Sequence, residues 1–136
     1  MSQPTNVAHQ MSLKSAEYTA AHDKDAWLAL YADDAVICDP VGVSPLDQTG
    51  LGHRGKEAIS AFYDLTIAPN TLSWNIRESY PAGDSCANVA TLTIDMMGTQ
   101  VVVDLVAVYR ANEDGKLASM HAYWSFDSVV RQLSGE

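Results

Sequence analysis

The chain has 136 residues, the size of one ordinary domain, with 47% hydrophobic and 18% charged residues, as in globular rather than disordered proteins. Seventeen acidic residues against eight basic ones give a net charge of −9. A chain this acidic is repelled by phosphate backbones and anionic lipid, so we expect no nucleic-acid or membrane partner.

Neither the N-terminal segment nor the cysteines indicate an exported protein. The longest apolar stretch, Val101 to Tyr109, contains Asp104 and is far too short to span a bilayer. The segment MSQPTNVAHQM has no basic stretch followed by an apolar one, so it does not resemble a secretory signal. Cys38 and Cys86 form no CxxC pair and read as reduced thiols. We therefore expect a cytoplasmic protein.

The N-terminal third is predicted to be mainly helical. Residues 1–10 contain Pro4 and polar neighbours and are expected to form a flexible tail, with a single domain over residues 11–136. The run 11–22 lacks Gly and Pro and predicts a helix, and 25–34 predicts a second, short one. The run 35–38 predicts a strand that Asp39-Pro40 ends.

The remaining chain predicts one long loop, one helix and a meander of strands. Glycines and a proline over 41–55 indicate the loop, and apolar residues at helical spacing predict a helix over 55–67. Four β-rich runs, separated by turn compositions, follow at 71–80, 86–97, 100–111 and 116–126, and then a short C-terminal piece. Helices followed by a meander indicate an α+β domain with helices on one face of an antiparallel sheet.

The strand predicted over 100–111 is apolar on both faces. Val101, Leu105 and Tyr109 share one face, and Val102 and Val106 share the other. Since an antiparallel sheet with one face in water should have a polar face, both faces should be covered. We expect helices or a ligand on one side and a partner subunit, in a homodimer, on the other.

Few residues indicate chemistry. The chain has no phosphate-binding glycine loop, nucleophile elbow or HExxH motif, and its four histidines are scattered, so no metal site is predicted. Asp39 allows two interpretations. With Pro40 it can begin a turn, or it can be a carboxylate at the end of a buried strand, acting as a general base with a pKa raised by desolvation.

Three segments resemble the Δ5-3-ketosteroid isomerase family of the SnoaL-like, nuclear-transport-factor-like group and are close to its mycobacterial steroid-binding relatives. They are YADDAVICDPVG, GHRGKEAISAFY and YRANEDGKLASMHAYWS, in order from Tyr31 to Ser125. The resemblance implies a cone-shaped barrel of a curved, mainly antiparallel sheet with three helices on its concave face. It also implies a steroid-like apolar ligand and no cofactor, since proton transfer needs none.

The resemblance assigns roles to several residues. Asp39 falls on the general base, which lifts a proton from the carbon α to the ketone and returns it two carbons along. Tyr31 and Tyr63 match tyrosines that support the oxyanion hole. Met120 and Trp124 match pocket walls, and Trp124 would stack on the steroid. We also expect Leu92 to contact the substrate.

Two matched positions depart from the family. Ser15 stands where the oxyanion tyrosine is expected, and Ala107 where the protonated aspartate is expected. We count both among the residues that would line the substrate pocket. The replacement donors that we consider are Tyr18, one helical turn after Ser15, together with Tyr63 and Tyr109. The 41–55 loop is longer than expected and could cover or reshape the entrance.

Three functions remain open on these residues. The first is a steroid Δ-isomerase with Asp39 as base and Tyr18 as a catalytic hydroxyl. The second is a protein that binds a steroid or similar apolar ligand without turnover, as the missing donors at Ser15 and Ala107 suggest. The third is another reaction on the same scaffold, such as polyketide cyclisation. Epoxide opening is disfavoured because Arg110 faces away from Ala107.

Overall fold

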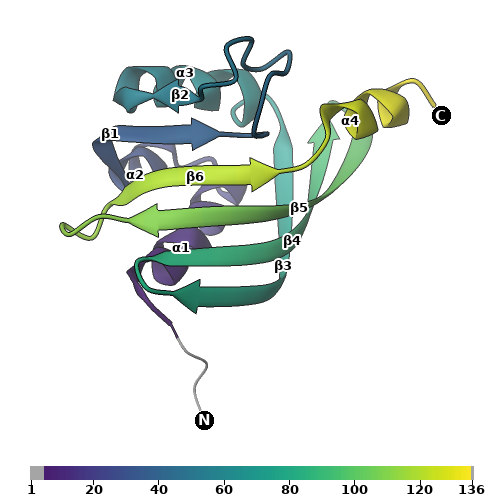
Figure 1. The fold of residues 1–136 in the computed structure, drawn as a ribbon. Helices are drawn as coiled ribbons and strands as arrows, with labels where there is room; N and C mark the ends of the chain where they lie inside the picture. Colours follow the sequence, from purple (N-terminus) through teal and green to yellow (C-terminus); the bar gives the residue numbers. More distant parts are fainter. Residues whose placement is uncertain (1–4, 136) are drawn as a thin grey trace.

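A computed structural model describes residues 5–135, which form an α+β fold with a six-stranded mixed sheet of order β2-β1-β6-β5-β4-β3. The sheet is strongly curved but stays open, so the predicted α+β cone is confirmed without closure into a barrel (Figure 1). The elements are α1 (Val7–Ala20), α2 (Lys24–Ala29), β1 (Tyr31–Cys38), β2 (His53–Arg54), α3 (Gly55–Thr66), β3 (Thr71–Ala82), β4 (Ser85–Met96), β5 (Thr99–Ala111), β6 (Leu117–Tyr123) and α4 (Phe126–Leu133).

The strand topology brings two chain segments to one edge. Strands β3 to β6 form the predicted antiparallel meander, whereas β1 joins β6 in parallel, with Ile37 opposite Met120. Because parallel neighbours end at the same edge, the residues that follow β1 and β6 leave the sheet side by side. These residues are Asp39 and Trp124.

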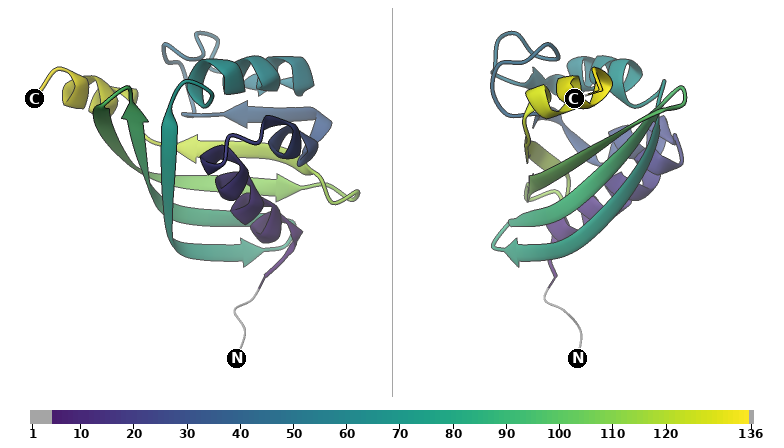
Figure 2. Two further views of the ribbon diagram at one scale, coloured as in Figure 1. Left: turned by 180° about the vertical axis from the view of Figure 1, so that it is seen from behind. Right: turned by 90° about the vertical axis from the view of Figure 1, so that its right-hand side faces the viewer.

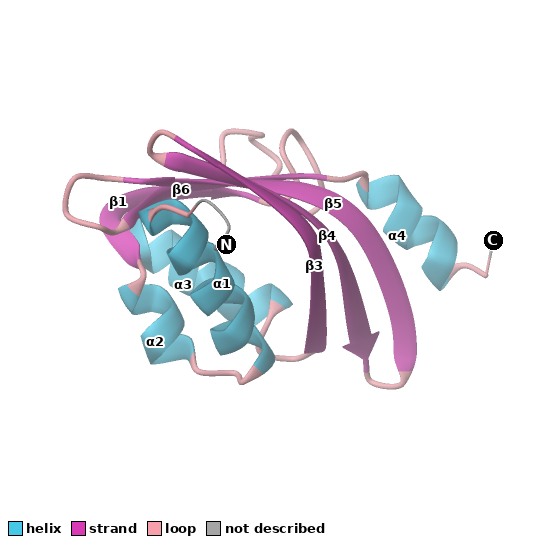
Figure 3. Ribbon diagram, turned by 90° about the horizontal axis from the view of Figure 1, so that it is seen from below, coloured by secondary structure: helices cyan, strands magenta, loops and turns pink. Residues whose placement is uncertain are grey.

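Helices α1, α2 and α3 cover the concave face of the sheet, as predicted (Figures 2 and 3). The N-terminus of α1 is capped by the Asn6 side chain, which accepts a hydrogen bond from the His9 N–H at 2.8 Å. Helix α4 lies apart from this layer, beside β5 (Figure 3). Within residues 5–135, no helix is long and apolar enough to cross a membrane.

Four element boundaries differ from the sequence prediction. Helix α1 begins at Val7, so residues 7–10 are helical rather than part of a tail; residues 1–4 lie outside the described part of the chain. Residues 31–34 belong to β1, because the Leu30 carbonyl accepts the Leu117 N–H and Tyr31 pairs with Leu117. The predicted loop contains β2, and the C-terminal piece contains α4.

The two faces of β5 differ in exposure, because buried and exposed residues alternate along the strand. Val101, Leu105 and Tyr109 are buried on the concave face, whereas Val102 and Val106 are 42% and 38% exposed on the convex face. The concave side therefore holds the hydrophobic core, and the convex side presents an apolar surface.

Candidate functional site

A cavity of about 220 Å³ lies on the concave side of the sheet, between the sheet and the helices. Its walls are mostly apolar and aromatic, as in sites for apolar ligands. Within residues 5–135, Asp39 is the only charged residue that lines it. No group of three His, Cys, Asp or Glu residues in the same range is placed to hold a metal ion.

Asp39 is half-buried where β1 ends. The Trp124 indole N–H donates a hydrogen bond to its Oδ1 at 2.6 Å. Burial raises the pKa of Asp39 above its usual value, and the Trp124 hydrogen bond opposes this rise by stabilising the charged form. The carboxylate is thus a stronger base than an exposed aspartate, held in one orientation by a neighbouring side chain.

Two tyrosines and a serine form a buried hydroxyl cluster, which consists of Tyr31, Tyr109 and Ser15. The pKa of Tyr109 is raised well above its usual range, by burial first and then by the charge of Asp39, while the nearby Ser15 hydroxyl lowers it. The pKa of Tyr31 is likewise raised by burial first and then by the charge of Tyr109, while the nearby Ser15 hydroxyl lowers it. Both phenols are therefore protonated at neutral pH and can donate hydrogen bonds.

The Tyr31 hydroxyl has no hydrogen-bond partner among the described residues, although it is buried and its residue lines the cavity. A buried, unpartnered hydroxyl costs free energy and is usually explained by a ligand or a function. Ser15 is held in place because its Oγ accepts the Trp27 indole N–H at 3.0 Å. The ring of Trp27 in turn packs on Tyr31, with centroids 5.1 Å apart.

Most of the residues predicted for the site do line the cavity. These are Ser15, Tyr31, Asp39, Leu92, Tyr109, Met120 and Trp124.

Three predicted site residues lie outside the cavity lining. Tyr18 is turned by roughly 100° on the helix from Thr19, which lines the cavity instead. Tyr63 is 3% exposed and packs on Trp27, with centroids 5.3 Å apart. Ala107 is buried, but its side chain ends at Cβ, so the larger residues two positions away on the same strand face reach the cavity.

Several cavity residues were not predicted. Helix α4 contributes Phe126, Val129 and Leu133, whose spacing of three, four and seven residues is a helical signal in the sequence. The long loop contributes Leu46. This loop is ordered by Asp47, whose carboxylate accepts hydrogen bonds from Thr49 and Gly52. It therefore forms part of the wall.

Comparisons with known proteins agree with this geometry. The profile of the SnoaL-like domain matches residues 14–120. The chain is 32% identical to a steroid Delta-isomerase of Nocardioides simplex over 102 residues, which are 75% of this chain and 76% of that protein.

Two solved structures are similar over nearly the whole chain. The Δ5-3-ketosteroid isomerase of a Mycobacterium species is 31% identical with a TM-score of 0.87, over 91% of this chain and 97% of that one. The protein Rv0760c of Mycobacterium tuberculosis, solved in complex with estradiol-17β-hemisuccinate, is 38% identical with a TM-score of 0.86, over 91% and 98% of the two chains.

Proposed function

Because the chain belongs to the SnoaL-like family and a steroid Delta-isomerase is among its relatives, we propose that it moves a proton next to a ketone, converting a 3-oxo-Δ5 steroid to the 3-oxo-Δ4 isomer. Asp39 is the general base of this proposal. The observation that carries it is the half-buried Asp39 carboxylate, which lines an apolar cavity and is fixed by Trp124 at 2.6 Å.

The proposed reaction is a proton transfer in two steps. Asp39 takes a proton from the carbon between the ketone and the double bond, and the negative charge spreads to the ketone oxygen. The protonated Asp39 then returns the proton two carbons along, which conjugates the double bond with the ketone. Apolar walls keep water away, so the proton stays with the carboxyl between the steps.

The ketone oxygen needs hydrogen-bond donors while it carries charge, and we assign this role to Tyr31 and Tyr109. Both hydroxyls are protonated at neutral pH, and the Tyr31 hydroxyl has no hydrogen-bond partner among the described residues. Ketosteroid isomerase is the established example of an aspartate base combined with neutral donors at the oxygen. Tyr18, outside the cavity lining, has no part in this assignment.

The test is turnover of 5-androstene-3,17-dione, followed by the ultraviolet absorbance of the conjugated enone that forms. Wild type should turn over, and Asp39→Asn should lose nearly all activity while it still binds the product in calorimetry. Equal rates for the two proteins would refute Asp39 as the base. Tight binding by wild type without turnover would instead support a steroid-binding protein, the second of the functions left open by the sequence.

We also propose that the chain forms a homodimer through the convex face of the sheet. Val102, Val106 and Tyr123 are 42%, 38% and 52% exposed there, and Val106 pairs with Tyr123 across β5 and β6. Such contiguous apolar surface marks an interface. Light scattering after gel filtration should give a dimer mass for wild type and a monomer mass for Val106→Asp. A monomeric wild type would overturn this proposal.

A further inference from the structure

The cavity has a second set of polar groups, separate from the hydroxyl cluster. Thr19, Thr66 and Asn70 line it, and Leu65, the neighbour of Thr66 in α3, also lines it and is 64% exposed. The proposed isomerisation does not use any of the three.

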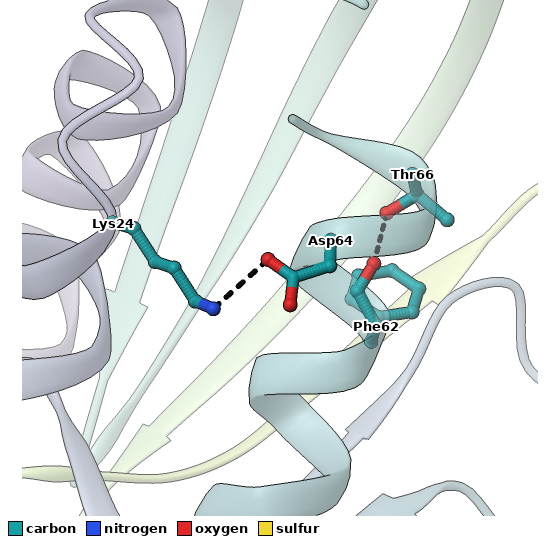
Figure 4. Close-up of polar contacts among 4 residues, drawn as sticks. All are labelled: Lys24, Phe62, Asp64 and Thr66. Atoms are coloured by element: carbon teal, nitrogen blue, oxygen red, sulfur yellow. Dashed lines mark hydrogen bonds and ion pairs between the residues drawn. The ribbon is translucent and has the colours of Figure 1, made fainter. Parts of the chain in front are cut away.

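The hydroxyl hydrogens of both threonines are already donated to backbone carbonyls. Thr66 Oγ1 donates to the Phe62 carbonyl at 2.8 Å, one turn back in α3 (Figure 4). Thr19 Oγ1 donates to the Ala16 carbonyl at 3.0 Å and accepts the Trp74 indole N–H at 3.1 Å. A threonine whose hydrogen is occupied by the backbone presents only acceptor lone pairs to a ligand.

Asn70 is fixed by three hydrogen bonds. Its backbone N–H donates to the Ile67 carbonyl at 3.1 Å, its carbonyl accepts from His22 Nε2 at 2.6 Å, and its Nδ2 donates to the Thr66 carbonyl at 2.7 Å. Because a carbonyl can only accept, the atom facing Thr66 must be the nitrogen, which fixes the orientation of the amide. No hydrogen bond to Asn70 Oδ1 is found within residues 5–135.

This polar set therefore suits a hydroxyl better than a ketone. A hydroxyl can donate to Asn70 Oδ1 or Thr66 Oγ1 and can also accept the second Nδ2 hydrogen. A ketone can accept only the second Nδ2 hydrogen of Asn70, and it leaves Asn70 Oδ1 and Thr66 Oγ1 without a donor. The hydroxyl cluster is the opposite, since Tyr31 and Tyr109 offer donors that suit a ketone oxygen.

Helix α1 runs from the hydroxyl cluster to the second polar set. Ser15 belongs to the hydroxyl cluster, and His22, just beyond the helix, contacts Asn70. Thr19 of the second set follows Ser15 by one helical turn, about 6 Å along the axis, and Asn70 lies farther on, beside His22 in the turn that follows the helix.

We infer that the natural ligand is a hydroxyketone, and that Asn70, with Thr66, selects a hydroxyl at the end remote from the reacting ketone. The inference rests on the proposed function, because the tyrosine end must hold the ketone. It adds a specificity-determining residue and a narrower class of substrate.

Two products of the proposed reaction form a matched pair of probes. Testosterone carries a 3-ketone and a 17-hydroxyl, and 4-androstene-3,17-dione differs from it only in a ketone at position 17. Dissociation constants measured by calorimetry should favour testosterone about fivefold, the value of one additional neutral hydrogen bond. Equal affinity, or a preference for the dione, would overturn the inference and leave the proposed function intact. Binding of neither compound would refute both.

Variants test whether Asn70 is the source of the preference. In Asn70→Leu the ratio of the two constants should fall to about one, mainly through weaker binding of testosterone. Thr66→Val keeps the side-chain shape and should lower the ratio in part, which also covers the case that Asn70→Leu does not fold. Thr91→Val is the control. The Thr91 hydroxyl donates to Asp104 at 2.6 Å on the convex face, so its removal should keep the wild-type ratio. An unchanged ratio in Asn70→Leu and Thr66→Val would overturn the inference.

Discussion

Trp124 and Asp39 are 85 residues apart in the chain, yet the indole N–H of one donates to the carboxylate of the other at 2.6 Å. The contact follows from the parallel pairing of β1 with β6, which brings the residues after both strands to one edge. It stabilises the charged form of Asp39 and so opposes the rise in pKa that burial causes.

Trp124→Phe should therefore shift the pH dependence of the proposed reaction. Without the donor the pKa of Asp39 rises further, so the acidic limb of the kcat/KM profile should move to higher pH. Trp74→Phe is the matched control, because its indole N–H lies in the same cavity but donates to Thr19. An acidic limb at the same pH in Trp124→Phe and wild type would contradict this role.

Asp39→Asn should stabilise the protein at neutral pH and not at acidic pH. Burial raises the pKa of Asp39 in the folded state, so below its unfolded value the group is protonated in both states and costs nothing. As the pH rises through the folded-state pKa, the buried charge destabilises wild type only. Thermal unfolding from pH 4 to pH 8 should show Tm curves that separate as the pH increases, with the variant higher by a few degrees. Tm curves of the two proteins that stay parallel over this pH range would contradict a raised pKa of Asp39.

Tyr31→Phe and Tyr109→Phe should each slow turnover by on the order of 10²–10³, the usual effect of removing one oxyanion donor. Tyr31→Phe should at the same time leave the free protein as stable or more stable, by about 1 kcal/mol, because the lost hydroxyl has no partner. Tyr63→Phe serves as control, since Tyr63 is buried outside the cavity lining. Enone formation and urea unfolding measure the two effects, and similar rates in Tyr31→Phe and Tyr63→Phe would argue against the donor role.

Those parts of the fold that depend on local pattern were predictable from the sequence. The alternation in β5 indicated its two faces, and the turn compositions separated the four strands of the meander. The start of β1 was not predictable, because Tyr31 to Asp34 read equally well as the end of a helix. What decides their structure is the pairing of Tyr31 with Leu117, a contact between distant segments that no local pattern encodes.

The cavity lining was predictable where the family resemblance supplied the residues, and much less where the chain departs from the family. Asp39, Trp124 and Met120 line the cavity as expected. With Ser15 at the expected tyrosine position, Tyr18, Tyr63 and Tyr109 were the candidate donors, and of these three only Tyr109 lines the cavity. That choice depends on the rotation of a helix relative to the sheet, which tertiary packing sets.

Helix α4 closes one wall of the cavity, and Gln132 attaches it to β5. Strand β6 pairs with β5 only from Val106 onward, so the backbone of Val102 lies at a free edge. The Gln132 side chain takes the place of a strand there. Its Nε2 donates to the Val102 carbonyl at 2.7 Å, and its Oε1 accepts the Val102 N–H at 2.8 Å.

Gln132→Ala should loosen α4 and so open the wall that Phe126, Val129 and Leu133 form. We expect a loss of about 1 kcal/mol in the free energy of unfolding, faster hydrogen exchange at the Val102 amide, and faster release of a bound steroid. Gln132→Glu keeps an acceptor for the Val102 N–H but sets a charge against the Val102 carbonyl, so exchange at that amide should be intermediate while release is still fast. Arg131→Ala, on the exposed side of α4, is the control. If the Val102 amide exchanges at the wild-type rate in Gln132→Ala, the two hydrogen bonds do not hold the helix, and packing of Val129 alone keeps it in place.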